Sequence, residues 1–298
     1  MVTGFSEQFD RHGAWRREMG ARLKDLAAWL KQHHLLDDGA DEGLQRLTEQ
    51  LRTDKVMVAF VAEFSRGKSE LINAVFFAGY GRRIMPASAG RTTMCPTELA
   101  HDAELPPCLR LLPIETRLQP QALMEWRLAP EKWTRVDLDV NDPEQLAGAM
   151  EKVSEVLHVE QDQARALGFW HDDRPEDNPP VNAQGLVEVP RWRHALINMA
   201  HPLLRQGLVV LDTPGLNAIG AEPELTVNLI PQAQAVVFIL AADTGVTKSD
   251  LGIWREHVAT MQDSSSSRFV VLNKIDALWD ELSTPAQIEA QIARQCAD

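Results

Sequence analysis

Residues 56–79 read VMVAFVAEFSRGKSELINAVFFAG, and this stretch indicates the architecture of the whole chain. It opens with an apolar run typical of a buried strand and passes through a short polar loop that ends in Gly67-Lys68-Ser69. An amphipathic pattern then predicts a helix over 69–78. A strand, a loop with this ending and a helix, in that order, form the phosphate-binding unit of P-loop proteins. The loop is therefore a candidate site for a nucleotide phosphate.

The loop nearly matches the pattern GxxxxGK[ST], with Ala62 in place of the first glycine. Alanine tolerates fewer backbone conformations than glycine, but a position at the end of a strand does not require positive φ, so Ala62 counts only modestly against the motif. The start of a helix favours anions, and Lys68 is expected to reach the outer phosphates while the Ser69 hydroxyl binds Mg²⁺. The other residues expected to contact the nucleotide are Glu63, Phe64, Ser65, Arg66, Gly67 and Glu70.

Two further polar motifs follow buried strands. In LVVLDTPG, Asp212 is expected to hold Mg²⁺ through water, and the Gly215 N–H can meet the terminal phosphate. In VVLNKID, Asp276 can accept two hydrogen bonds from guanine that adenine cannot donate, with Asn273 and Lys274 beside it. The three motifs, in this order and at strand ends, predict that the nucleotide is GTP rather than ATP.

Four near-continuous apolar runs, KVMVAFVA, GLVVLD, AVVFILAAD and RFVVLNKID, predict parallel strands that are buried on both faces. Helices are expected between and after them, near 225–232, over 248–261 and over 285–295. The pattern predicts an α/β fold of the P-loop class, a Ras-like, mostly parallel sheet with flanking helices and a strand order resembling 2-3-1-4-5.

Residues 1–53 form a separate unit ahead of the sheet, in which two helices are predicted. Apolar residues recur there at spacings of three and four, which gives each helix an apolar stripe. The stripes either pack on the body of the domain or join other helices in a bundle, and the pattern alone does not decide between these arrangements. The first stripe comprises Phe9, Trp15, Met19, Leu23, Leu26 and Leu30, and the second Leu44, Leu47 and Leu51.

The second unit, residues 54–298, carries a long insertion at about 101–206 that interrupts the alternation of strands and helices. The pattern of apolar residues in this insertion predicts two strands and two helices. They are a strand at 108–112, a helix near 119–127, a longer helix over 143–159, and a strand at RWRHALINM, 191–199.

Composition narrows the class of protein. With 298 residues and 44% apolar side chains, the chain can bury a sizeable core. A net charge of -13 and a pI near 5.2 argue against a nucleic-acid-binding surface. Three widely spaced cysteines suit a reducing cytosol, and the longest clean apolar run, 235–242, is too short to span a bilayer. We expect a cytoplasmic protein that can associate peripherally with a membrane.

The motifs together resemble the GTPase domain of the dynamin superfamily, particularly that of bacterial dynamin-like proteins. The resemblance covers about 55–100 and 200–298 well, and 101–200 less specifically, although this family's GTPase domains are similarly enlarged. It rests on EFSRGKSELINA, on GRTTMCP with its threonine three residues before a proline, on LLRQGLVVLDTPGLN, and on FILAADTGVTKSDL followed by VLNKID.

The resemblance implies that GTPase domains pair across the nucleotide as a homodimer, and that water attacks the γ-phosphate of Mg²⁺-bound GTP. Thr93 would complete the metal shell and hold the attacking water through its main chain. Ser65 lies where eukaryotic dynamins place a serine that helps to bind a monovalent cation. With Lys68 and Ser69, these residues and Arg66 make up the expected catalytic set.

Phe64 departs from the family pattern, and the role of Arg66 has two interpretations. Phe64 replaces a glutamine that positions water in eukaryotic dynamins, and phenylalanine cannot form that hydrogen bond. Either another group positions the water or turnover is slow. Arg66 could act as an arginine finger, in cis or across a dimer, or could simply face solvent near the phosphates.

Only one helix can follow Asp276, whereas the resemblance implies a further strand, a final helix, a helical stalk and a membrane-contacting tip. We therefore expect an N-terminal portion of a longer protein that binds and hydrolyses GTP and, when complete, remodels or attaches to membranes. Two alternatives stay open: a monomeric regulatory GTPase without a membrane role, and a nucleotide-binding scaffold with little hydrolysis.

Overall fold

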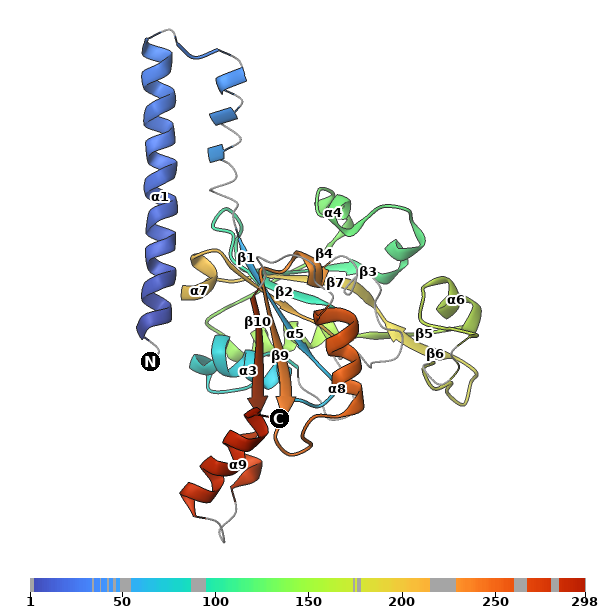
Figure 1. The fold of residues 1–298 in the computed structure, drawn as a ribbon. Coiled ribbons are helices and arrows are strands. Elements are labelled where there is room, and N and C mark those ends of the chain that lie inside the picture. Colours follow the sequence, from blue (N-terminus) through green and yellow to red (C-terminus); the bar gives the residue numbers. More distant parts are fainter. Residues whose placement is uncertain are drawn as a thin grey trace.

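A computed structural model describes residues 3–33, 35–37, 39–41, 43–44, 47–48, 55–86, 95–173, 175, 178–214, 229–259, 267–279 and 284–297. At its centre lies an eight-stranded sheet of order β10-β9-β1-β8-β2-β7-β3-β4 (Figure 1). The strands are β1 (Val56–Ala62), β2 (Thr97–Ala100), β3 (Cys108–Pro113), β4 (Thr134–Asp137), β7 (Trp192–Asn198), β8 (Leu208–Asp212), β9 (Ala235–Ala241) and β10 (Ser267–Asn273).

The strand order predicted from the sequence is confirmed. Strands β8, β1, β9 and β10 are parallel neighbours, and β2 joins β8 in the antiparallel direction. Numbered among themselves along the chain, these five strands have the order 2-3-1-4-5. The parallel strands end at the same edge of the sheet, so the polar residues that follow them are brought together there.

Two apolar layers cover the sheet, because successive side chains of a strand point to opposite faces. On one face, Phe60 and Ala62 pack in a cluster with buried residues of α3 (Lys68–Phe76) and α5 (Pro143–Glu151). On the other, Ala59 and Val61 pack in a cluster with Ile253 of α8 (Lys248–Ile253) and with residues of the insertion. The phosphate loop is thus anchored by a strand that is buried on both sides.

The insertion enlarges this sheet. Strand β7 pairs in parallel with β2, and β3 and β4 follow it with antiparallel pairing. A separate two-stranded sheet, β5 (Val156–Val159) with β6 (Val187–Pro190), packs with α6 (Gln161–Ala166) around a third apolar cluster. The predicted strands at 108–112 and 191–199 correspond to β3 and β7, and are confirmed.

Several predicted helices are shorter than expected. The helix predicted over 143–159 is wrong beyond Glu151, since a 3-10 turn and strand β5 follow there. The helix predicted near 119–127 is reduced to α4 (Leu123–Trp126), and α8 gives way at Trp254 to a π-helical turn. Of the helix predicted near 225–232 the structure describes only the end, a 3-10 turn at Ile230–Gln232. The last predicted helix is confirmed as α9 (Pro285–Ala297).

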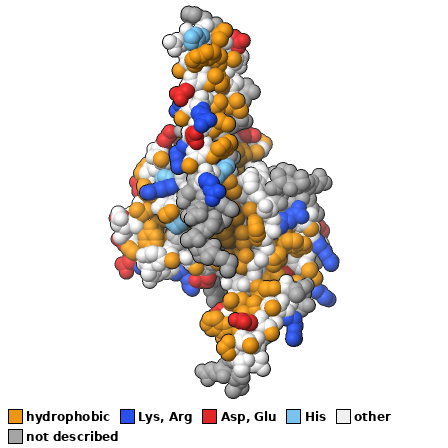
Figure 2. Space-filling view, turned by 60° about the vertical axis from the view of Figure 1, so that its left-hand side comes forward, with side chains coloured by type: hydrophobic (Ala, Val, Ile, Leu, Met, Phe, Trp, Pro, Cys, Tyr) orange, Lys and Arg blue, Asp and Glu red, His pale blue; other side chains and the backbone are white. Residues whose placement is uncertain are grey.

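The first helix, α1 (Thr3–Gln32), projects beyond the sheet at its side (Figure 1). Arg16 donates a hydrogen bond of 2.9 Å from Nη2 to the carbonyl oxygen of Gln206. Trp15, Met19 and Leu26 remain 50%, 39% and 44% exposed, and Figure 2 shows hydrophobic side chains along this projection. Much of the predicted stripe is therefore open. The second predicted helix lies mostly outside the described residues.

A buried polar trio joins the sheet to the insertion. The His194 ring of β7 lies 2.9 Å from a carboxylate oxygen of Glu98 on β2, and Arg127 pairs with the same carboxylate. Glu98 is 3% exposed and His194 is fully buried. Burial alone would raise the pKa of Glu98, but the hydrogen bonds and positive charges of His194 and Arg127 outweigh it and lower that pKa.

Candidate functional site

The phosphate loop adopts a backbone that few residue types favour. Ser65 and Gly67 have φ of 63° and 84°, in the left-handed region. Such conformations in non-glycine residues are uncommon and concentrate at functional sites. Ala62 lies within β1 and is not among the described residues with positive φ, so the glycine of the usual motif is not required there. The expectation for Ala62 is confirmed.

Gly67 is the residue at which the loop and the NKID motif meet. It stands at the N-cap of α3, where no side chain caps the first backbone N–H groups, so these groups can face an anion. Asn273 donates a 2.9 Å hydrogen bond from Nδ2 to the carbonyl oxygen of Arg66. A Cβ atom at Gly67 would overlap Asn273 Nδ2. Glycine is therefore needed for this close approach, in addition to its backbone conformation.

Lys68 and Asp212 meet at the ends of α3 and β8. The Lys68 ammonium group pairs with Oδ1 of Asp212, and the two residues are 8% and 0% exposed. Thr213 follows Asp212 and donates from Oγ1 to the carbonyl oxygen of Phe60 at 2.8 Å, which ties the end of β8 to β1. The pairing places a cation and a carboxylate at the start of the helix, where phosphate and Mg²⁺ are expected.

The second carboxylate oxygen of Asp212 indicates whether this site can hold a magnesium ion. Asp212 Oδ2 is buried and has no hydrogen-bond partner among the described residues. A buried carboxylate oxygen normally has a partner, so an unsatisfied one suits a metal-bound water. Ser69 lies half-buried in the first turn of α3, in the position expected of a magnesium ligand. The residues present therefore fit Mg²⁺, while Thr93 lies outside the described residues.

The NKID motif follows β10, the strand at the end of the sheet. Lys274 has φ of 55°, and its ammonium group lies 3.0 Å from Asp243 Oδ2 in the loop between β9 and α8. The hydrogen bond from Lys274 lowers the pKa of Asp243. Asp276 lies exposed in a 3-10 turn, Ile275–Leu278, so its carboxylate is accessible to a base.

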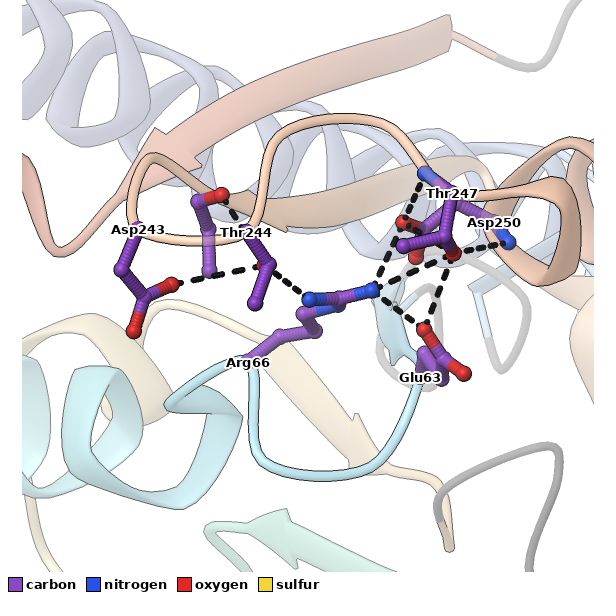
Figure 3. A network of polar contacts seen from close by, with 7 residues as sticks. Glu63, Arg66, Asp243, Thr244, Thr247 and Asp250 are labelled. Carbon is purple, nitrogen blue, oxygen red and sulfur yellow. Dashed lines mark hydrogen bonds and ion pairs between the residues drawn. The ribbon is translucent and has the colours of Figure 1, made fainter.

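Arg66 is held by polar side chains and does not face solvent. It is 5% exposed, and its guanidinium group turns toward the β9–α8 loop (Figure 3). One nitrogen, Nη2, lies 2.9 Å from Asp250 Oδ2 and 3.3 Å from Thr247 Oγ1. The guanidinium group also contacts the carboxylate of Glu63 and the hydroxyl of Thr244. The alternative in which Arg66 faces solvent is therefore wrong.

Four residues of this site were not among those proposed from the sequence: Asp243, Thr244, Thr247 and Asp250. The sequence did carry one signal, the spacing of Thr247 and Asp250, which is that of a helix capping box. Both reciprocal bonds of that box are present at the start of α8. The spacing predicts a helix start but gives no indication that Arg66 binds the same two side chains.

The remaining predicted residues occupy varied places. Phe64 is 42% exposed, and Ser65 is also exposed on the loop. Glu70 points to the surface side of α3, where it pairs with Arg83. The structure thus brings the phosphate loop, Asp212 and the NKID motif together, while Gly215 lies outside the described residues.

Comparisons with known proteins give a family and several relatives. The dynamin family matches residues 58–275. A bacterial dynamin-like protein of Nostoc punctiforme is 21% identical over 297 residues, and the transmembrane GTPase Marf of Drosophila melanogaster is 24% identical over 254 residues. The matches cover 96% and 85% of this chain but only 35% and 24% of those proteins.

One solved structure is similar over 95% of this chain and 35% of its own, with a TM-score of 0.51 and 15% identity. It is described as "An oligomerised bacterial dynamin pair provides a mechanism for the long range sensing and tethering of membranes". At this identity the likeness shows the fold alone. Among the described residues, no helix is both long and apolar enough to cross a membrane.

Proposed function

Because this chain belongs to the dynamin family, with a GTPase domain that spans most of its length, we propose that it binds GTP and hydrolyses it to GDP and phosphate. The observation that carries the proposal is the meeting of three motifs from distant parts of the chain. Lys68 pairs with Asp212, and Asn273 bonds the phosphate loop at Arg66. Each motif alone is common, but their convergence at one edge of the sheet is what a guanine nucleotide requires.

The proposed roles at the phosphates follow from the geometry. On nucleotide binding, Lys68 exchanges part of its pairing with Asp212 for the outer phosphates, and the free N–H groups of α3 face the phosphate oxygens. Ser69, Thr93 and Asp212 would hold Mg²⁺, which supplies neutralisation of the phosphate charge when bound. The Gly215 N–H would meet the γ-phosphate, and Ser65 would contribute to a monovalent cation site.

Guanine selection is assigned to the NKID motif. The exposed carboxylate of Asp276 would accept two hydrogen bonds from guanine, and adenine offers no matching pair of donors. Asn273 is already committed to the phosphate loop, and Lys274 to Asp243. These two residues therefore support the shape of the site, and Asp276 carries the discrimination between GTP and ATP.

Catalysis would depend on positioning and charge neutralisation, since phosphoryl transfer needs little covalent chemistry from the protein. Thr93 would hold the attacking water through its main chain. Phe64 has no group that can orient water, and it is 42% exposed on the phosphate loop. We therefore expect a single molecule to turn over slowly. This residue also favours the second candidate function, a scaffold that keeps intact GTP.

Pairing with a second copy across the nucleotide is proposed as the activating step. Three exposed apolar side chains lie on the two segments that Arg66 joins: Phe64 on the phosphate loop, Val246 on the β9–α8 loop and Leu251 on α8, at 42%, 49% and 43% exposure. Large exposed apolar side chains on segments joined to a polar site favour a surface that another protein covers. A partner molecule would bury them and order the loops.

Membrane attachment or remodelling is proposed only for the full-length protein. The relatives include a protein named as a transmembrane GTPase and a bacterial dynamin pair described as tethering membranes. This chain spans 35% and 24% of the lengths of the two curated relatives. We propose a peripheral, cytoplasmic protein in which residues 1–53 form part of a helical bundle, because much of the α1 stripe is exposed.

The test is the rate of GTP hydrolysis per molecule, measured over about two orders of magnitude of protein concentration, with Lys68→Ala as the blank. Pairing predicts that the specific rate climbs with concentration and vanishes in the blank. A flat specific rate above the blank would favour a monomeric regulatory GTPase. A rate equal to the blank, with retention of bound GTP, would favour the scaffold.

A further inference from the structure

The side chain and the main chain of Arg66 bind different parts of the site. Its carbonyl oxygen accepts a hydrogen bond from Asn273 of the NKID motif, at 2.9 Å. Its guanidinium group contacts side chains of the β9–α8 loop and the start of α8, namely those of Thr244, Thr247 and Asp250 (Figure 3). One residue of the phosphate loop is thus joined to both neighbouring segments.

The ion pair between Arg66 and Asp250 is buried, which makes it costly to break. The side chain of Asp250 is 1% exposed and that of Arg66 is 6% exposed, so solvent cannot replace either partner. Glu63 adds a second carboxylate on the guanidinium group. If Arg66 turned toward a phosphate, it would leave Asp250 as a buried charge without a cation. The two carboxylates share Nη2 and the hydroxyl of Thr244 accepts from Nη1, so both terminal nitrogens that an arginine finger would use are already held.

The β9–α8 loop is tied to the NKID motif as well. Lys274 pairs with Asp243 at 3.0 Å, and the backbone N–H of Ala242 donates to the carbonyl oxygen of Asn273 at 2.9 Å. The phosphate loop, the β9–α8 loop and the NKID motif therefore form a closed ring of contacts. Arg66 belongs to two of the three junctions in that ring.

We propose that Arg66 is a positioning residue: with Asp250, in the first turn of α8, it fixes the phosphate loop against the start of α8 and the loop before it, and it does not act as an arginine finger. The inference rests on the proposed function, because it concerns the same nucleotide site. It assigns roles to Asp250, Thr247 and Thr244, none of which belongs to a nucleotide-binding motif. The start of α8 thereby supports the phosphate loop.

The two roles of Arg66 differ in their effect on GDP. A finger contacts charge that develops in the transition state, so its loss lowers kcat and leaves GDP binding unchanged. A positioning residue shapes the loop that holds the phosphates of GDP and GTP alike. Its loss therefore raises Kd for both nucleotides, and removal of Asp250 has the same consequence.

The experiment measures Kd for fluorescent mant-GDP and for a non-hydrolysable GTP analogue in the full chain, together with kcat and KM for GTP. The variants are Arg66→Ala, Asp250→Asn and the double variant. We expect each single variant to raise Kd for both nucleotides about tenfold. The double variant should have a Kd no higher than that of the worse single variant, because the same interaction is lost in all three. Arg66→Lys, which keeps the charge, should recover part of the affinity.

A matched control separates this effect from general instability. Arg127→Ala breaks another largely buried ion pair, with Glu98 of β2, that makes no contact with Arg66 or Asp250, and should leave the affinity for mant-GDP at the wild-type value. Thermal unfolding without nucleotide verifies that each variant is folded. If Arg127→Ala weakens binding as much as Arg66→Ala, the effect is general and the proposal is overturned.

The outcome for a finger is also distinct. Unchanged Kd for mant-GDP in Arg66→Ala with a large fall in kcat, or wild-type behaviour of Asp250→Asn, would overturn the positioning role and leave the proposed GTPase function standing. If the wild-type chain binds neither nucleotide, the proposed function has failed, and this inference fails with it.

Discussion

At the scale of single residues, Gly67 has little freedom to change. We expect Gly67→Ala to weaken GDP binding by about tenfold or more, because alanine strains a backbone at φ 84° and its Cβ would push Asn273 away from the loop. Isothermal titration calorimetry with GDP measures the change in affinity.

Gly148→Ala serves as the control. This glycine lies exposed in α5, and nothing lies within 4 Å of an added Cβ. Alanine is a better helix former, so the variant should bind GDP as the wild type does and gain about 0.5 kcal/mol in free energy of unfolding. GDP affinity of Gly67→Ala equal to that of wild type would mean that the contact with Asn273 does not shape the site.

Glu98 predicts how stability depends on pH. Its pKa in the folded chain lies below the ordinary value of 4.5, so its contribution to stability is fully present above pH 4.5 and is lost as the pH falls through the folded pKa. We expect Glu98→Gln to lower the free energy of unfolding at pH 7 by about 3 kcal/mol, because Arg127 loses its buried partner. Urea denaturation of both proteins, at pH 7 and below 4.5, measures the difference.

The stability difference between wild type and Glu98→Gln should shrink as the pH falls, since the wild-type carboxylate becomes protonated. A difference that is constant over the same pH range would refute this assignment of the charge. Glu188→Gln provides the comparison: Glu188 is paired only loosely, at 3.7 Å, with His158 on the surface. Its loss should change the free energy of unfolding by about 0.5 kcal/mol or less.

The candidate site could be predicted in part from single residues. Lys68, Asp212 and Asn273 belong to short motifs whose residue types and spacing follow from phosphate and base chemistry, and the structure brings them together. The partner of Arg66 could not be predicted in this way. Asp250 lies 184 residues further along the chain, and no local pattern records which distant charge a buried guanidinium will meet.

At the scale of elements, apolar periodicity predicted the strands better than the helix lengths. The run over 143–159 has helical spacing, yet the chain leaves the helix after Glu151 and forms β5. The reason is tertiary: Val156, Leu157 and Val159 pair with β6, about thirty residues later in the chain. Strand propensity depends on such partners, so spacing within one segment cannot place the end of the helix.

The start of α5 has a local cause that can be tested. Asp142 accepts hydrogen bonds from the backbone N–H groups of Glu144 and Gln145, at 2.9 and 3.1 Å, and so caps the helix. Asp142→Ala should lower the free energy of unfolding by about 1 kcal/mol. Asp142→Asn should lower it much less, because asparagine can also cap a helix. Urea denaturation at pH 7 compares them. Equal losses in the two variants would show that charge, and not the cap, is the cause.

At the scale of the whole molecule, the sequence predicted the order of five strands but not the use of the insertion. The order was expected from the likeness to a Ras-like sheet, because nucleotide motifs stand at the ends of β1, β8 and β10. The insertion adds β7, β3 and β4 beside β2, where pairing depends on contacts between residues as far apart in the chain as Thr97 and Ala195. Long-range pairing of that kind leaves no signature in one sequence.

The proposed pairing of two molecules gives the last prediction. Val246 is 49% exposed on the β9–α8 loop, so Val246→Asp should cost the isolated chain little stability but should place a desolvated charge at the partner's surface. We expect the rise of specific GTPase rate with protein concentration to be lost, while the rate at the lowest concentration and the affinity for GDP stay near wild type.

Leu128→Asp, at 86% exposure on the insertion, is the control and should keep the rise of specific rate with concentration. If Val246→Asp retains the concentration dependence, any pairing uses another surface; if it abolishes GDP binding, the loop acts within one molecule.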